Sequence, residues 1–436
     1  MGRSGEKDSA LRSELDELRS QNQALRIHLE RFQDARHVTL HLLRLLTRPV
    51  RRRARALRAR VTSSPDPDDY HAGFRAYTAR SGQPPAAEHP RVLHAIGNFV
   101  TGGSARLVVD LIERLGSEYE QRVIIATPPP VRGYEEVPLE EYPNLTSARP
   151  LRRLFDDFRP DIVHVHYVAD HRKSWDDLYY RWYIHVFHAA EQAGSRLIEN
   201  VNIPTEPYRR DAVDRYVFVS DHVRRSYGWE GDRATVIHPG SDLAHFRRPA
   251  GYVDPPGTVG LVYRLQRDKL DETSIDPIIE VLRRRKAARA IVIGGGELLP
   301  GYKQVAAHAG VDDRLTFTGF VAYDQLPAWY GRMTMFIAPV HTESFGQVTV
   351  FAMGMELPVA GYRVGALEEI LGDAELLAPP GDVAGLADIL VGLLDDPDRA
   401  RQIGARNRRR AEARFSVEQM VEEYRGLYRG LVERGN

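Results

Sequence analysis

The sequence predicts an α/β protein in which two doubly wound, Rossmann-like domains face a cleft and follow an N-terminal helical arm. A length of 436 residues fits two or three domains. From residue 91 short apolar runs alternate with longer helical patterns, and this series restarts after a proline-containing stretch at 245–256. The predicted segments are a coiled-coil helix (1–36), a basic amphipathic segment (37–61), a linker (62–90), a first domain (91–246), a second domain (247–415) and a final helix (416–436).

The composition excludes several classes of protein. Hydrophobic residues make up 42% and charged residues 28% of the chain, as in soluble globular proteins. No apolar run approaches the roughly 18 residues of a membrane span, and the N-terminus lacks a signal-peptide pattern, so a cytoplasmic location is expected. The absence of cysteine excludes disulfides and thiol nucleophiles. Equal numbers of basic and acidic residues, 60 each, argue against binding to nucleic acid.

The N-terminal arm has the pattern of a coiled coil. Apolar residues recur at alternating spacings of four and three from Leu11 to Phe32, and Asn22 occupies one inward position. A single buried asparagine at such a position fixes the register of parallel dimers. We therefore expect a homodimer, the alternative being a single helix packed on its own protein.

A basic segment follows the heptads. Eight arginines and no acidic residue occur between residues 44 and 60. Such a segment either lies on an anionic membrane surface, here the inner face of the plasma membrane, or is a solvated helical face. Without interleaved aromatic residues, it lacks the features of a nucleic-acid site. The prolines of 62–90 indicate a linker.

Ligands of doubly wound sheets bind at the carboxyl ends of the strands. The strands expected are 91–96, 121–126, 161–166, 196–199 and 216–219 in the first domain, and 257–263, 288–293, 315–317, 335–338 and 358–360 in the second. After the first strand, Gly102 and Gly103 precede a helix expected over 105–115, which makes either an anion cradle or a simple turn. Their spacing fits neither a dinucleotide nor an ATP loop.

Charged and glycine-rich loops follow the strands of the second domain. Arg264 and Lys269 lie just past its first strand, where they are suited to neutralise a diphosphate, although charged residues there can serve surface solubility alone. Gly295 is the middle glycine of a loop that a flat base could approach. Glu343 to Gly346 form a turn that opens a helix, offering a carboxylate and backbone amides.

Taken in order, these motifs resemble those of a known family. They read F-x-x-G-G, D-I-V-H-V-H, I-H-P-G-S-D, R-L-x-x-x-K, G-G-G, F-T-G-F, E-S-F-G-Q-V and V-G-A-L-E-E-I. Over about 91–430 the chain is similar to the retaining nucleotide-sugar glycosyltransferases of the GT-B fold, the glycosyltransferase family 4 type.

The resemblance implies a function for each motif. A nucleoside diphosphate sugar would bind mainly to the second domain and the acceptor mainly to the first, with no metal and no further cofactor, and the last helix would cross back to the first domain. Arg264 and Lys269 would hold the diphosphate, and Glu343 the sugar hydroxyls. The backbone amides of Phe345, Gly346 and Gln347 would bind the sugar and the phosphate. Gly102 and Gly103 would close over the donor from the first domain.

Three positions depart from the family pattern. Phe351 stands where the second glutamate of an acidic pair would bind the ribose, and Tyr263 replaces a glycine of the phosphate loop. Asn202 stands where the active-site histidine is usual, and an amide can form hydrogen bonds but cannot carry a positive charge. We expect His164 and His166 to lie on opposite faces of their strand, and we favour His166 as the residue at the cleft. The alternative for each is a buried histidine with a structural role. A metal site is not expected, because no carboxylate cluster accompanies them.

The leading hypothesis is a retaining glycosyltransferase acting in cell-surface glycan, glycolipid or natural-product glycosylation on a sugar, lipid-linked or small-molecule acceptor. The alternative is a catalytically degenerate GT-B scaffold that assists an active transferase, which the departures at Phe351, Tyr263 and Asn202 motivate.

Overall fold

The computed structural model describes residues 89–100, 102–128, 137–143, 145, 147–167, 178–208, 211–229, 231–249, 251–252 and 255–433. The coiled-coil helix, the basic segment and nearly all of the linker lie outside these residues. The expected dimer and membrane contact therefore stay predictions.

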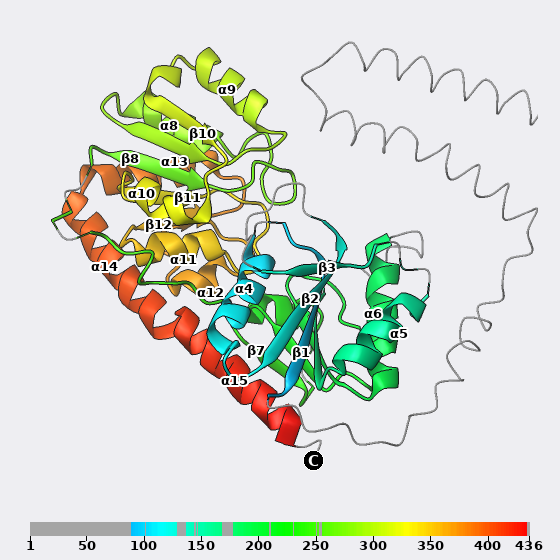
Figure 1. Cartoon of the computed structure of the whole chain (residues 1–436). Helices are drawn as coiled ribbons and strands as arrows, with labels where there is room; N and C mark the ends of the chain where they lie inside the picture. Colours follow the sequence, from blue (N-terminus) through cyan, green and yellow to red (C-terminus); the bar gives the residue numbers. More distant parts are fainter. Residues whose placement is uncertain are drawn as a thin grey trace, which may run out of the picture. The chain divides into compact units, whose positions relative to one another are not determined.

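The first domain is built on a sheet of seven parallel strands in the order β3-β2-β1-β4-β5-β6-β7. Its strands are β1 Arg91–Asn98, β2 Glu120–Thr127, β3 Leu139–Glu141, β4 Ile162–Tyr167, β5 Arg196–Val201, β6 Arg215–Phe218 and β7 Ala234–Val236. Its helices are α4 Gly103–Leu115, α5 Arg149–Phe158, α6 Leu178–Ala193 and α7 Asp221–Arg225 (Figure 1).

The second domain repeats this arrangement with six parallel strands in the order β10-β9-β8-β11-β12-β13. Its strands are β8 Thr258–Val262, β9 Arg289–Ile293, β10 Leu315–Gly319, β11 Met335–Ala338, β12 Val359–Tyr362 and β13 Leu377–Ala378. Its helices are α8 Asp276–Arg284, α9 Leu299–His308, α10 Leu326–Tyr330, α11 Gln347–Gly354, α12 Leu367–Leu371, α13 Val383–Asp395 and α14 Pro397–Arg414, with short 3₁₀ turns at Asp312–Arg314 and Tyr323–Gln325.

The two strand orders confirm the prediction of two Rossmann-like sheets. The order reverses between β1 and β4 in the first sheet and between β8 and β11 in the second, and these are the points at which doubly wound sheets bind ligands. All ten expected strands are present. The structure adds β3, β7 and β13, which sequence reasoning missed because strands of two or three residues leave no readable apolar run.

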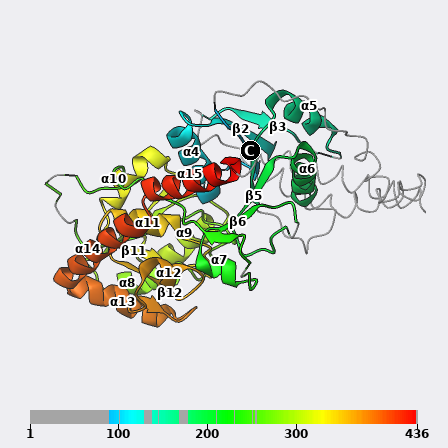
Figure 2. The same ribbon diagram turned by 90° about the horizontal axis from the view of Figure 1, so that it is seen from below.

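The C-terminal helix α15, Val417–Glu433, packs against the first sheet rather than the second. Its buried side chains lie on one face of the helix and join a core with α4 and the strands. They are Val417, Met420, Val421, Tyr424, Tyr428 and Leu431. The crossing is fixed by backbone bonds: the Ser241 N–H donates to Phe415 O at 2.8 Å, and the Val417 N–H donates to Ser241 O at 3.0 Å. Figures 1 and 2 show α14 and α15 as consecutive helices that lead from the second sheet to the first.

None of the helices in the described part of the chain is long and apolar enough to cross a membrane.

Candidate active site

Lys269 and Glu343 meet at the reversal point of the second sheet. Lys269 lies in the loop after β8 and Glu343 in the loop after β11, and the carboxyl ends of these neighbouring parallel strands share one edge of the sheet. The Lys269 ammonium forms an ion pair with Oε1 of Glu343. The His341 N–H donates to Lys269 O at 3.0 Å, which ties the two loops together. The sequence placed both residues at strand ends, and the structure brings them into contact.

The Glu343 side chain is buried, whereas the Lys269 side chain remains one-third exposed. Among the described residues, Oε2 of Glu343 and the hydroxyls of Tyr263 and Thr349 have no hydrogen-bond partner. Burial and the charge of Glu343 raise the pKa of Tyr263 well above its ordinary value, so the phenol keeps its proton. One carboxylate oxygen and two hydroxyls are thus buried close together beside the Lys269 ammonium.

Helix α11 begins at Gln347, four residues after Glu343. Gly346 at its N-cap has a φ of 95°, a left-handed conformation that favours glycine, and a side chain there would come within 3.3 Å of Glu343 Cγ. The N–H groups of Thr349 and Val350 already bond to Gly346 O. The start of a helix carries partial positive charge, and so this turn sets a carboxylate beside a weak anion site.

The glycine loop after β9 packs against the loop that carries Arg264. A Cβ on Gly294 would lie 1.8 Å from Tyr263 O, so this position allows no side chain. The Leu265 N–H donates to Gly295 O at 3.0 Å, while the space above Gly295 is open within 4 Å. Gly294 therefore serves packing, and Gly295 is the glycine that leaves room for a ligand.

Arg264 shares the Lys269 loop but has other partners. Its exposed guanidinium bonds to Gln266 Oε1 at 3.1 Å and to Asp268 Oδ2 at 2.6 Å. Exposed ion pairs contribute little to stability, so Arg264 can exchange Asp268 for a phosphate at small cost.

The loop with Gly102 and Gly103 approaches α11 from the first domain. A Cβ on Gly103 would meet Gln347 Oε1 at 3.0 Å, and Gln347 Nε2 donates to Gly240 O at 3.0 Å. The Gln347 side chain therefore links the domains, and its main chain is the part that can face a ligand. Phe345 is buried, with its ring centroid 5.7 Å from that of Phe415.

Glu369 of α12 is an interdomain contact that sequence reasoning missed. Its carboxylate accepts the N–H groups of Asp221 and His222, at 2.9 and 3.0 Å, at the start of α7. It also lies 2.8 Å from Nε2 of His238. Although burial raises its pKa, these hydrogen bonds outweigh burial and lower the pKa of Glu369 below its ordinary value. Next to it, the Ser220 hydroxyl donates to Ser344 O at 2.5 Å, beside Glu343.

Phe351 lies in an aromatic cluster. Its ring stacks on Phe246 with centroids 4.0 Å apart and planes within 2°, and it meets Tyr323 edge-on at 5.8 Å. Arg106 of α4 lies over the Tyr323 ring at 4.7 Å. The place where the family has a ribose-binding carboxylate is therefore packed with rings.

On the acceptor side, Asn202 follows β5. Its Oδ1 accepts from Asn200 Nδ2 at 2.8 Å, and its own Nδ2 has no partner among the described residues. The side chain is nearly buried. An amide with one unpaired donor can bind a hydroxyl but cannot act as a base.

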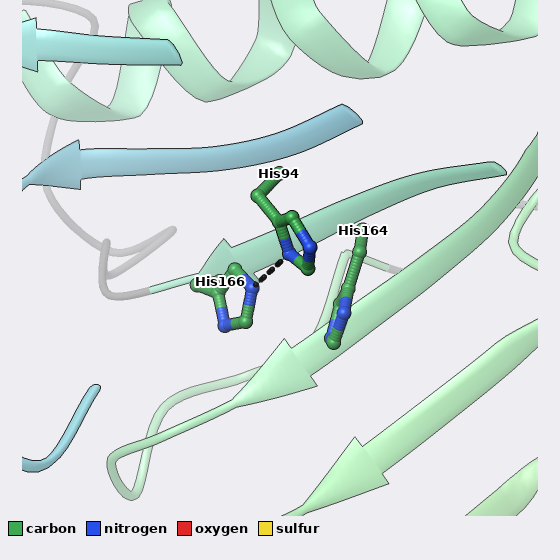
Figure 3. A group of neighbouring side chains, drawn as sticks. All are labelled: His94, His164 and His166. Carbon is green, nitrogen blue, oxygen red and sulfur yellow. Dashed lines mark hydrogen bonds between the residues drawn. The ribbon is translucent and has the colours of Figure 1, made fainter. Parts of the chain in front are cut away.

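His166 is fully buried, which does not favour contact with a substrate. Our expectation that His164 and His166 face opposite sides of the sheet is wrong, because residues two apart in a strand share a face. Their ring centroids are 4.1 Å apart, and His94 of β1 lies against both (Figure 3). Sequence reasoning missed His94, although β1 and β4 are neighbours in every sheet of this order.

Comparisons with known proteins agree with this fold and motif order. A model described as Glycosyltransferase Family 4 matches residues 101–245, and one described as Glycosyl transferases group 1 matches 257–396. The D-inositol 3-phosphate glycosyltransferase of Streptomyces scabiei is 25% identical over 384 residues, covering 74% of this chain and 86% of that protein. The GDP-mannose-dependent alpha-(1-6)-phosphatidylinositol monomannoside mannosyltransferase of Mycobacterium tuberculosis is 30% identical over 241 residues, covering 50% of this chain and 63% of that protein.

Solved structures share the two-sheet architecture. Anabaena HepE in complex with UDP-glucose superposes with a TM-score of 0.65 at 17% identity, covering 78% of this chain and all of HepE. Sucrose-phosphate synthase from Thermosynechococcus elongatus gives a TM-score of 0.63 at 16% identity, covering 79% of this chain. With two family models on consecutive stretches, the ordered motifs and the shared fold, the chain belongs to the family 4 type glycosyltransferases of the GT-B fold.

Proposed function

We propose that this glycosyltransferase is a retaining enzyme that moves a sugar from a nucleoside diphosphate sugar to an acceptor hydroxyl without a catalytic metal. The observation that carries the proposal is the ion pair between Lys269 and the buried Glu343 at the reversal point of the second sheet, beside the start of α11. A cation, a carboxylate and a helix N-terminus at one strand edge match the parts of a sugar diphosphate.

Each part of the donor has a partner in this arrangement. Lys269 and Arg264 neutralise the diphosphate, Arg264 after leaving Asp268. The unpaired oxygen of Glu343 accepts hydrogen bonds from the sugar hydroxyls. The open backbone at Gly295 leaves room for the base.

The chemistry follows from this charge distribution. As the glycosidic bond stretches toward an oxocarbenium-like state, negative charge grows on the leaving phosphate, and Lys269 stabilises it. The acceptor hydroxyl attacks from the same face and passes its proton to that phosphate. The anomeric configuration is thereby kept, and no side chain has to act as a strong base, which fits an amide at Asn202.

The acceptor class is proposed from the relatives. Two of them are named for inositol phosphate and phosphatidylinositol acceptors. The proposed acceptor is therefore a polar ring alcohol, either free or attached to a lipid. A lipid acceptor also fits the proposed membrane contact of the arginine segment, and a cytoplasmic enzyme at the inner face of the plasma membrane.

Calorimetric titration with UDP, GDP, ADP and CDP and their hexose conjugates tests the proposal. We expect micromolar binding of one nucleoside diphosphate, and a loss of at least tenfold in affinity for Lys269→Ala. Lys286→Ala, which replaces an exposed lysine, is the matched control and should keep the parent affinity. Failure of the whole panel to bind supports the degenerate scaffold instead.

Configuration is tested separately. Nuclear magnetic resonance of the product formed with the preferred donor reports the anomeric form, and an inverted product contradicts a retaining mechanism. Turnover after extensive treatment with chelator tests whether the reaction needs a metal.

A further inference from the structure

Three histidines converge inside the first domain, away from the proposed donor site. In the register of β1 and β4, His94 pairs with His164, and His166 lies two residues further along. All three side chains share one face of the sheet and are fully buried (Figure 3). One ring nitrogen from each lies within 4.8 Å of the others.

The hydrogen bonds of Gln121 determine which ring nitrogen of His94 carries the proton. Gln121 Nε2 donates to Leu111 O at 3.2 Å, so its Oε1 is the atom that faces His94 Nε2 at 2.9 Å. A carbonyl oxygen only accepts, and His94 therefore carries its proton on Nε2. Its Nδ1 is left with a lone pair and accepts a hydrogen bond from His166 Nε2 at 3.2 Å. A metal ion that binds both of these nitrogens replaces the proton between them.

Two other ring nitrogens of the cluster have no partner. Among the described residues, neither His164 Nε2 nor His166 Nδ1 has a hydrogen-bond partner within 3.5 Å, although both are buried and the Asn200 side chain interacts with His164. The second nitrogen of His164 is held by the Tyr428 hydroxyl at 2.7 Å. Buried polar atoms without partners are rare in native proteins. An ion bound at His164 Nε2 would satisfy that atom, whereas His166 Nδ1 is not one of the ligand atoms.

We propose that His94, His164 and His166 form a zinc site inside the first domain. Three neutral imidazoles are a common ligand set for zinc. Zn–N bonds of about 2.0–2.1 Å in a tetrahedron place two ligand nitrogens roughly 3.3 Å apart, close to the separation of His94 Nδ1 and His166 Nε2. His164 Nε2 completes the set of three protein ligands.

The surroundings of the cluster agree with metal binding. Zinc-bound histidines normally use their other nitrogen for a hydrogen bond that orients the ring, and Gln121 and Tyr428 do this for His94 and His164.

Tyr428 gives the site a structural consequence. It belongs to α15, which returns from the second domain to pack on the first sheet. A metal held by β1 and β4 would orient His164 toward Tyr428 and so stabilise the docking of α15. The ion has no part in the transfer reaction, and the site does not depend on the proposed function.

Cobalt titration of the untagged, full-length, chelator-treated chain tests the site. We expect one Co²⁺ per chain, with the intense visible absorption of tetrahedral cobalt, displaced by one equivalent of Zn²⁺. Binding of less than a tenth of an equivalent, or only the weak spectrum of six-coordinate cobalt, would overturn the proposal and leave a hydrogen-bonded histidine cluster.

Variants locate the ion. His166→Gln should weaken Zn²⁺ binding at least a hundredfold, and the conservative Tyr428→Phe about tenfold by freeing the His164 ring. His308→Ala, which replaces an exposed histidine, is the control and should bind Zn²⁺ as tightly as the parent does. Unchanged zinc affinity in folded His166→Gln, checked by circular dichroism, places the ion elsewhere. Nucleotide affinity measured in parallel stays at the parent value, so this proposal and the donor site stand or fall separately.

Discussion

Glu369 of the second domain lies 2.8 Å from His238 of the first, and the same carboxylate accepts two amide hydrogens at the start of α7. A single side chain thereby holds a helix terminus and a histidine across the domain boundary. The link is next to the Ser220 to Ser344 hydrogen bond, one residue from Glu343. The contact between the domains therefore lies directly beside the candidate donor site.

Glu369→Gln should loosen this contact. The amide keeps the shape of the side chain but loses charge-assisted hydrogen bonds, and so the free energy of unfolding should fall by about 1–3 kcal/mol. Urea denaturation measures this change. The neighbouring, exposed Glu368→Gln is the matched control and should stay within about 0.5 kcal/mol of the parent. Equal stabilities for the two variants would mean that the contact carries no net energy.

Removal of either member of the Lys269 and Glu343 pair should abolish most activity. Lys269→Met loses the positive charge beside the leaving phosphate, and a contact of this kind is worth about 2–4 kcal/mol in the transition state, a factor of roughly 30 to 10³ in kcat. Steady-state kinetics with the preferred donor measures the effect. Lys303→Ala, an exposed lysine on α9, is the control. A kcat for Lys269→Met within threefold of the parent would contradict the assignment.

Sequence patterns predicted Lys269 and Glu343 because both lie just past strands, and parallel strands end at a common edge. The contacts of His94 and Glu369 could not be predicted from sequence patterns in this way. The contact of His94 with His164 depends on sheet register, and that of Glu369 with α7 depends on how the domains face each other. Local periodicity encodes neither. The coiled-coil and arginine segments stay predictions from pattern alone.

The aromatic packing of Phe351 predicts a weak dependence on the ribose. A carboxylate at this position would bind the ribose hydroxyls by charge-assisted hydrogen bonds, whereas Phe351 stacks on Phe246. The 2′-deoxy form of the preferred nucleotide should therefore bind within tenfold of the ribonucleotide in calorimetry. A larger loss would show that another group holds the 2′-hydroxyl.

Phe351→Glu should not restore a family-type ribose site. It removes a buried ring and introduces a charge among Phe246 and Tyr323, and the expected loss of stability is at least about 3 kcal/mol. Thermal unfolding measures this loss, and Phe351→Leu, which keeps an apolar side chain, should cost less. A Phe351→Glu protein as stable as Phe351→Leu would contradict the account of this cluster.

The buried Glu199 of β5 should make stability depend on pH. Burial raises the pKa of Glu199 from 4.5 to about 8, partly offset by the Tyr208 N–H, which both carboxylate oxygens accept at 2.9 Å. Between these two pKa values the unfolded chain loses the proton that the folded chain keeps. The unfolding free energy therefore falls as pH rises through this window, by up to about 1.4 kcal/mol per pH unit for this group.

Glu199→Gln removes the titration, while its amide oxygen can still accept from Tyr208. From pH 5.5 to 7.5 the stability of this variant should rise relative to the parent by roughly 2–3 kcal/mol, because only the parent releases a proton on unfolding. Urea unfolding at a series of pH values measures the two slopes. Exposed Glu368→Gln supplies the control and should follow the parent slope. Parallel slopes for Glu199→Gln and the parent would show that Glu199 is ionised in the folded protein, against the direction that burial imposes.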